Sequence, residues 1–229
     1  MAGEKEIWFF DDVNLYNILC PHRVKDAKKR EQHKFYDFKK DEFIYFEDDP
    51  ADKIFLIANG RVKIGSYSEE GDEFIKAILT RGELFGERSL LGEGKRSDFA
   101  QALDNNTTVC PMTIDDMQDL MLNNKPLSFK INKIINFRFK KLERRLELLI
   151  FKDVRTRLVE FLKDVTKEKG KMMGHEVFVE NFLTHKDIAQ LIGSSRQTVT
   201  TLLNELEQEG VLRFQRKNFF VKQEELAAL

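Results

Sequence analysis

The sequence predicts an α+β fold that begins with an antiparallel β-barrel, continues in a long helix and ends in a mainly helical domain. Three observations predict this order. Short alternating apolar segments divided by turn residues fill 35–112, which is typical of an antiparallel jelly-roll barrel. A helical pattern without glycine then covers 125–151, and two short amphipathic helices meet at a glycine within 184–203. We therefore expect domains at 1–124, 125–152 and 153–229.

Composition indicates a soluble protein, because the chain has 229 residues, of which 41% are hydrophobic and 34% charged. No apolar run reaches the roughly 20 residues of a membrane span, and the N-terminus lacks the basic-then-apolar order of a signal peptide. We expect a cytoplasmic protein with no membrane partner. Cys20 and Cys110 form no CxxC motif, which excludes a cysteine-ligated zinc or a four-cysteine iron–sulfur cluster within one chain. We expect two buried thiols and no metal site.

The strand signals of the barrel are short and are divided by turns. Gly60 and the turn around Gly71 each separate two of them. Before residue 35 the chain is polar except for 13–19, where we expect a short packing helix. The predicted strands are 43–46, 54–58, 61–67, 74–79, 99–103 and 108–112.

The helix predicted at 125–151 carries an apolar seam in which spacings of four and three residues alternate. Such a seam, over about two heptads, is typical of a coiled coil and predicts a homodimer. Packing of the seam on the chain's own barrel is the alternative. Basic residues also outnumber acidic ones in 129–157, either as a surface for phosphate or as a solvated helix face. The seam residues are Ile135, Phe139, Leu142, Leu146 and Leu149.

The segment 184–203 predicts a helix-turn-helix. Ala189 allows the two helices to approach closely, and Gly193 suits the left-handed turn position. Val199 then returns an apolar side chain to the inner face. A helix hairpin with a solvated polar face is the alternative.

In the second helix of this motif, Ser194 or Ser195 can cap the N-terminus, and polar side chains face outward. Arginine suits guanine and glutamine suits adenine through paired hydrogen bonds in the major groove. The residues predicted to contact DNA are Ser195, Arg196, Gln197, Thr198, Thr200 and Thr201.

Two strand signals follow Gly210 and predict a hairpin, or wing, beside the helix-turn-helix. Its turn carries Arg216 and Lys217, which we predict to contact phosphate. A stabilising hairpin without DNA contact is the alternative for each of these side chains.

The segment 85–97 predicts an anion site in the barrel. A glycine before a short helical turn, Gly86, exposes backbone N–H groups, and Arg96 offers a two-pronged partner for phosphate. Ser97 adds a hydroxyl, and the Glu87 carboxylate can accept hydrogen bonds from a ribose. A buried Arg–Glu pair that ties a loop to the barrel is the alternative.

In the order of its parts and in these motifs, the sequence resembles the Crp/Fnr family of bacterial transcription regulators, the family of the cyclic-AMP receptor protein. The resemblance implies a cyclic-nucleotide-binding-like barrel, a homodimer, double-stranded DNA as ligand and RNA polymerase as a partner. The family's recognition run Ser-Arg-Glu-Thr-Val matches 195–199, with Gln197 in place of glutamate. The family's effector-binding pairs match Gly86 with Glu87 and, one residue closer than in the family, Arg96 with Ser97.

Three further positions depart from the family pattern. Leu142 and Glu143 stand where cyclic-AMP sensors hold adjacent threonine and serine hydroxyls against adenine, although the Glu143 carboxylate can accept from an exocyclic amine. Thr201 stands where many members carry a second arginine. Despite these departures, the resemblance implies a cyclic nucleotide, cAMP or cGMP, as effector and no tightly bound cofactor. A different effector, or none, is the alternative.

Other functions receive no support from the residues. Clustered cysteines of the Fnr type are absent, and Glu87 and Arg88 stand where the carbon-monoxide sensors hold a haem-ligating histidine. No nucleophile, base and orienting group occur at a catalytic spacing, so we predict no catalytic residues and no enzyme. As mechanism we expect allostery, in which the effector draws the barrel against the long helix and re-aims the winged domains about a hinge at Lys152 and Asp153.

Overall fold

The computed structural model divides the chain into two compact units, one ending at Phe139 and the other beginning at Lys140. Because this boundary falls inside the long helix, each unit is described separately. The predicted division of the chain at residues 124 and 152 stays a prediction. Cys20, the wing-turn residues Arg216 and Lys217 and most of the helix predicted at 13–19 lie outside the described residues. The structure describes residues 15, 19, 35–92, 94–180, 183–215 and 218–228.

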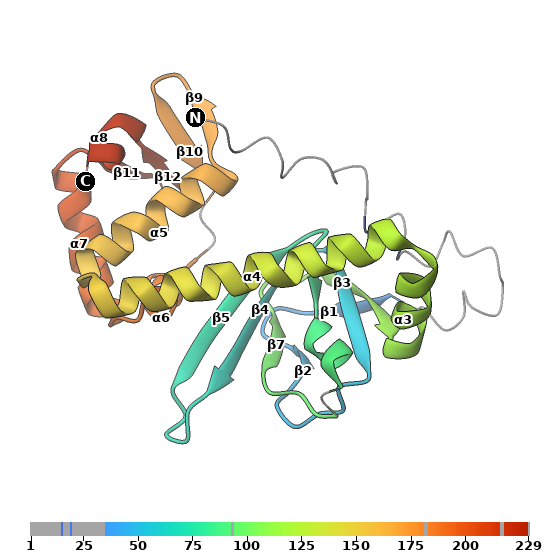
Figure 1. Ribbon diagram of the computed structural model, residues 1–229. Helices are drawn as coiled ribbons and strands as arrows, with labels where there is room; N and C mark the ends of the chain where they lie inside the picture. Colours follow the sequence, from blue (N-terminus) through green and yellow to red (C-terminus); the bar gives the residue numbers. More distant parts are fainter. Residues whose placement is uncertain are drawn as a thin grey trace. The chain divides into compact units, whose positions relative to one another are not determined.

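The first unit is a jelly-roll of two four-stranded antiparallel sheets (Figure 1). All six predicted strands are present, each within one residue of its predicted ends, and β1 and β6 are additional short strands. One sheet has the order β1 (Tyr36–Phe38), β8 (Thr107–Thr113), β3 (Lys53–Asn59) and β6 (Leu84–Phe85). The other has the order β2 (Phe43–Tyr45), β7 (Phe99–Ala102), β4 (Arg61–Tyr67) and β5 (Glu73–Thr80).

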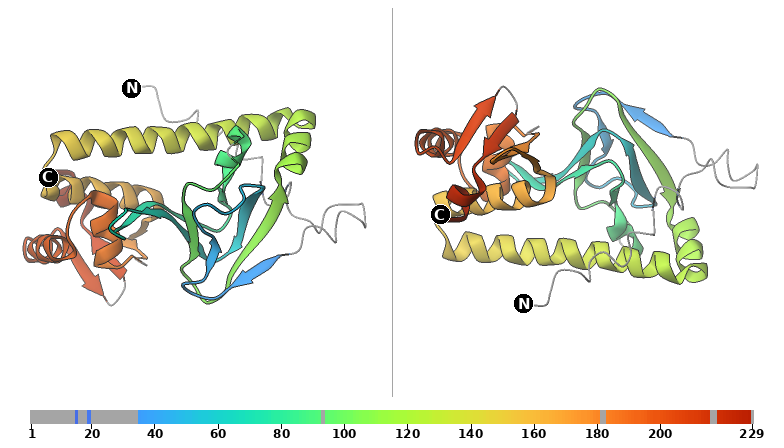
Figure 2. Two further views of the ribbon diagram at one scale, coloured as in Figure 1. Left: turned by 90° about the horizontal axis from the view of Figure 1, so that it is seen from below. Right: turned by 90° about the horizontal axis from the view of Figure 1, so that it is seen from above.

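Both sheets contribute to the core between them, since alternate side chains of each strand point inward. A second core forms where α3 (Ile114–Asn123) and the first turns of α4 (Lys125–Phe151) lie against β3 and β8 (Figures 1 and 2). Leu127 and Ile131 of α4 are fully buried there, and Leu15 and Leu19 pack into the same cluster. This corner fixes the start of the long helix on the jelly-roll.

α4 has the predicted bounds because no glycine interrupts it and its ends are marked locally. The Asn124 side chain accepts a hydrogen bond from the Leu127 amide at the N-terminal end, where Pro126 fits the first turn. At the other end, Asp153 caps the next helix, α5 (Val154–Lys169), by accepting from the Thr156 amide. No helix among the described residues is long and apolar enough to cross a membrane.

The second unit packs its helices around a four-stranded antiparallel sheet. In this sheet the strand at 176–179 pairs with a short neighbouring strand at 171–173. Leu158, Val199 and Phe219 are among the buried residues that hold the layers together. The elements are β9 (Lys171–Met173), β10 (Glu176–Val179), α6 (His185–Ile192), α7 (Arg196–Gln208), β11 (Leu212–Gln215), β12 (Asn218–Val221) and α8 (Gln223–Ala228), and the sheet order is β11-β12-β10-β9.

Candidate functional site

Gly86 begins the candidate effector site. It has a φ of 77° and precedes the short 3₁₀ helix η3 (Glu87–Leu91). A Cβ at this position would lie 2.9 Å from Arg96 Nη1 and 3.2 Å from the Lys53 carbonyl oxygen. Both the left-handed backbone and the close approach of the guanidinium therefore require glycine.

Arg96 is buried, with 6% of its surface exposed. Its Nη1 donates to Ser89 Oγ at 2.7 Å and to the Gly86 carbonyl at 3.3 Å, and its Nη2 donates to the Lys53 carbonyl. The guanidinium lies 4.3 Å from the centre of the Tyr45 ring, a cation–π distance. Among the described residues its Nε finds no hydrogen-bond partner. A buried cation with an unused N–H suits an anion.

Glu87 forms an ion pair with Arg138 of α4, which also donates to the Leu84 carbonyl. Both side chains are largely buried, with 14% of Glu87 and 23% of Arg138 exposed. Glu87 is therefore in a largely buried Arg–Glu pair, as the alternative expected, but its partner is Arg138 of α4 rather than Arg96. Arg138 was not predicted as a site residue, because the excess of basic residues in 129–157 does not show which of them reaches Glu87.

Ser97 is exposed, and its carbonyl accepts a hydrogen bond from Lys76 Nζ at 2.9 Å. The next residue, Asp98, is buried beside Arg96's aromatic neighbour and accepts from the Tyr45 hydroxyl at 3.2 Å. Burial raises the pKa of the Asp98 carboxyl, although Lys76 at 3.7 Å opposes the rise. Burial, with the Asp98 charge, also raises the pKa of Tyr45. The structure thus places buried polar groups around the arginine.

The helix-turn-helix forms where it was predicted, from α6 and α7. Thr184 and Asp187 form a capping box at the start of α6, and Gly193 ends that helix with a φ of 66°. Ser195, the second of the two candidate caps, accepts from the Thr198 amide at 3.1 Å and starts α7.

The outer face of α7 is polar. Arg196, Gln197 and Thr201 are exposed in its first two turns, whereas Thr198 and Thr200 are half-buried. The inner face buries Val199 and two leucines, so the helix shows one face to its own core and the other to solvent. The N-terminal end of α7 can therefore enter a major groove.

Comparison with known proteins assigns both units. Residues 36–124 match the family model of the cyclic nucleotide-binding domain, and residues 156–229 match that of the Crp-like helix-turn-helix domain. The global nitrogen regulator of Synechococcus elongatus is 31% identical over 80% of this chain and 83% of its own. The cyclic AMP receptor protein of Thermus thermophilus is 30% identical over 87% of this chain and 88% of its own.

The chain belongs to the Crp/Fnr family. It is a DNA-binding transcription regulator with a cyclic nucleotide-binding domain, and it belongs to a family of regulators rather than of enzymes. Its fold is that of solved members, since the structure of a CooA mutant from Carboxydothermus hydrogenoformans superposes with a TM-score of 0.79. That protein is 26% identical in sequence, with 95% of both chains covered.

Most side chains of the apolar seam on α4 are exposed in the single chain of this Crp/Fnr regulator. Ile135 is half-buried against the core, but 60% of Phe139, 50% of Leu142 and 59% of Leu146 are exposed. Leu149 is 38% exposed and lies beside Gly193, where an added Cβ would come within 2.6 Å of the Leu149 Cδ2 atom. Glu143, also exposed, lies in the second unit, whereas the other effector-site candidates lie in the first.

Several basic residues of the stretch 129–157 pair within the protein, although their side chains stay partly exposed. Contact of this stretch with phosphate stays a prediction. Arg144 pairs with Glu160 and Asp164 of α5, Arg155 pairs with two glutamates of α7 and its end, and Arg157 donates to backbone carbonyls. Within the second unit, these contacts join α4 to α5, and α5 to the two helices of the helix-turn-helix.

In the wing of this Crp/Fnr chain, β11 and β12 form the predicted hairpin. Arg213 of β11 pairs with Glu176 at 2.9 Å and lies 4.3 Å over the Phe220 ring, so it stabilises the sheet. The two turn residues predicted to contact phosphate lie outside the described residues, and their role stays a prediction.

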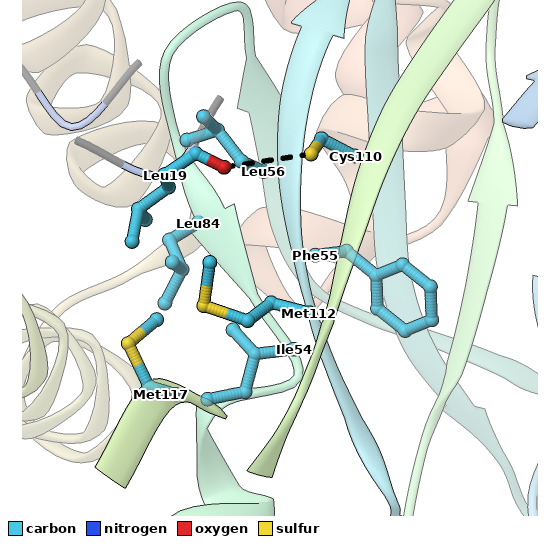
Figure 3. Close-up of a pocket in the computed structure, with 8 residues that line it drawn as sticks. All are labelled: Leu19, Ile54, Phe55, Leu56, Leu84, Cys110, Met112 and Met117. Atoms are coloured by element: carbon cyan, nitrogen blue, oxygen red, sulfur yellow. Dashed lines mark hydrogen bonds between the residues drawn. The ribbon is translucent and has the colours of Figure 1, made fainter. Parts of the chain in front are cut away.

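A pocket in the first unit is part of the apolar core rather than a second ligand site (Figure 3). Among the residues drawn in Figure 3, the buried Cys110 thiol donates to the Leu19 carbonyl at 3.7 Å. The described residues include no group of histidine, cysteine and acidic side chains placed to hold a metal ion. The pocket is lined by Leu19, Ile54, Phe55, Leu56, Leu84, Cys110, Met112 and Met117.

Proposed function

We propose that this Crp/Fnr regulator is a homodimer whose DNA affinity is set by a cyclic nucleotide bound at residues 85–97. The observation that carries the proposal is Arg96, a buried guanidinium whose Nε has no hydrogen-bond partner among the described residues. Gly86 holds the backbone close to this cation, and its left-handed conformation begins a short helix whose amides favour an anion.

Each residue has a role in the proposed complex. Arg96 and the Ser97 hydroxyl bind the cyclic phosphate, while Glu87 accepts from the ribose hydroxyl. The Glu87 carboxylate already pairs with Arg138, so a bound ribose shares or competes for that carboxylate. Since Arg138 belongs to α4, the effector acts on the long helix through this pair.

The base of the nucleotide is held differently from adenine in the cyclic-AMP sensors, which bind it through two adjacent hydroxyls. By its place in the sequence, Glu143 supplies an acceptor for the exocyclic amine, which adenine and guanine both carry, whereas Leu142 belongs to the seam. Relatives support cAMP as the first candidate, since one is the cyclic AMP receptor protein of Thermus thermophilus and another is a cAMP-activated regulator of Mycobacterium tuberculosis.

The dimer forms through the seam of α4. Phe139, Leu142 and Leu146 are each at least half exposed in the single chain, and such a row of large apolar side chains is stabilised by a second copy. The two-fold symmetry then presents two α7 helices to half-sites about one DNA turn apart.

Calorimetry tests the effector. The wild type is titrated with cAMP and with cGMP, beside Arg96→Gln and Lys95→Ala. Lys95 is adjacent in sequence, its side chain is 72% exposed, and its loss controls for a general change of charge. We expect binding by the wild type and Lys95→Ala and loss of binding by Arg96→Gln. Equal binding by all three proteins would contradict the assigned site.

Analytical ultracentrifugation tests the dimer. Leu146→Glu places a charge on the seam, whereas the neighbouring Glu147→Gln leaves the seam unchanged. We expect the first variant to sediment as a monomer and the second as the wild-type dimer. A wild type that is monomeric at micromolar concentration would overturn the dimer proposal.

A regulator with another effector, or none, is the second candidate. Two observations favour it. Glu87 and both Arg96 Nη atoms already bind groups of the protein, and residues 142 and 143 carry no hydroxyl. Fluorescence anisotropy with operator DNA separates the two. Tight DNA binding that neither nucleotide alters would favour this candidate over the first.

A further inference from the structure

His185 joins three elements of the DNA-reading unit. It is the first residue of α6, and its Nδ1 lies 2.9 Å from the Thr200 hydroxyl oxygen on α7. Its ring centre lies 6.3 Å from that of Phe214 on strand β11 of the wing. The capping box of Thr184 and Asp187 fixes the backbone on either side. The imidazole is therefore held between the first helix, the reading helix and the wing.

The hydrogen-bond direction between these two side chains follows from the Thr200 hydroxyl. That hydroxyl donates its single hydrogen to the Arg196 carbonyl at 2.9 Å. His185 Nδ1 must then be the donor and Thr200 Oγ1 the acceptor. The hydroxyl thus donates its hydrogen and accepts one hydrogen bond within the protein.

We propose that His185 is a positioning residue for DNA readout, which turns Thr200 into a reader of the thymine methyl group. With its hydroxyl fixed between His185 and the Arg196 carbonyl, Thr200 presents its γ-methyl to the groove. Thymine is the base whose C5-methyl offers an apolar contact there. This inference rests on the proposed placement of α7 in the major groove.

The test uses full-length protein and an operator selected from random DNA by the wild type. Each thymine of one half-site is replaced in turn by deoxyuridine, which removes only the methyl group. We expect one replacement to weaken wild-type binding about fourfold, the worth of one buried methyl-sized group. Thr200→Ser, which keeps the hydroxyl and lacks the methyl, should bind both operators equally.

His185 variants separate positioning from packing. His185→Ala frees the Thr200 side chain to rotate and should bring the thymine-to-uracil affinity ratio close to one. His185→Asn, whose amide can donate in place of Nδ1, should restore the ratio in part. His175→Ala, at an exposed histidine in the turn between β9 and β10, should keep it. Unfolding midpoints close to wild type confirm that each variant is folded.

Two results would overturn the inference: no thymine at which uracil matters to the wild type, or an unchanged ratio in His185→Ala. Arg196→Ala, measured on the operator and on random DNA, reports on the placement of α7 itself. If it weakens only the operator while the uracil results are negative, the His185 inference alone fails. If it weakens both DNAs equally, the proposed placement of α7 fails.

Discussion

Arg138 of the long helix donates to the carboxylate of Glu87, which follows the glycine of the candidate effector site. The same guanidinium donates to the Leu84 carbonyl, so it binds the strand that leads into that site as well. The seam proposed for the dimer is on this helix. A ligand that alters the Glu87 carboxylate therefore acts directly on a side chain of the seam helix.

A double-mutant cycle measures the coupling of this pair. Glu87→Gln, Arg138→Gln and the double variant are unfolded in urea without nucleotide. We expect a coupling free energy of about 1–3 kcal/mol, because removing one partner leaves the other largely buried and unpaired.

The control for that cycle is the pair of Lys95 and Asp48, whose side chains are 72% and 84% exposed. Solvent screens such a pair, so its coupling should stay below about 1 kcal/mol. Equal coupling energies for the two pairs would show that Glu87 and Arg138 are no more closely linked than surface charges.

The buried Asp98 predicts a pH dependence of stability. Burial raises the pKa of its carboxyl in the folded state above the unfolded value of about 3.9. The folded protein then holds this proton more tightly, so the contribution of Asp98 to stability is lost as pH rises from about 4 through the raised pKa.

Asp98→Asn removes this titration and keeps an acceptor for the Tyr45 hydroxyl. In urea unfolding at a series of pH values, the wild type should lose stability relative to the variant as pH rises through that window. A constant difference at every pH would show that the carboxyl does not titrate abnormally.

The elements most completely predicted from the sequence are those whose signal is local. The long helix has its predicted bounds, because its limits depend on Asn124, the cap Asp153 and the absence of glycine. Gly193 likewise shows the left-handed conformation that the helix-turn-helix requires. Strands β1 and β6 were not predicted, because β1 is short and mainly exposed and the two residues of β6 are too few to show alternation.

The chemistry of the candidate site was harder to predict, because its partners are distant in the sequence. Gly86 and Arg96 are in contact as expected, but Arg138 is 51 residues from Glu87. The carbonyl of Lys53 is 43 residues from Arg96. Packing of α4 against the jelly-roll creates the first pair and the fold of the jelly-roll creates the second. A charge count along the chain shows neither. The same holds for Arg144, whose acidic partners are on the following helix.

Gly193→Ala should destabilise the protein for two reasons. Its φ of 66° costs a residue with a Cβ about 1–2 kcal/mol, and that Cβ would also lie 2.6 Å from Leu149 Cδ2. Gly174→Ala is the matched control, since Gly174 has a φ of 67° and open space around it.

Urea unfolding should give a larger loss for Gly193→Ala than for Gly174→Ala. In a Leu149→Ala background, the loss at 193 should fall toward the loss at 174. If the two glycine variants lose the same free energy, Leu149 does not constrain the turn.

DNA binding by Arg196 is predicted to be base-specific. Arg196→Ala should weaken binding to the selected operator by about 1–3 kcal/mol and relax the preference at one base pair. Lys217→Ala, in the wing turn, should weaken all DNA alike and lower the salt slope by about one phosphate contact. Fluorescence anisotropy against operator and random DNA at several salt concentrations measures both effects.

Arg144→Gln is the control for these DNA measurements, because it removes a basic residue whose guanidinium pairs with Glu160 and Asp164. We expect its salt slope to equal that of the wild type, since that arginine neutralises carboxylates rather than phosphates. A lowered slope would place the basic stretch on DNA after all. Equal weakening of operator and random DNA by Arg196→Ala would remove that arginine from base readout and contradict the proposed placement of α7.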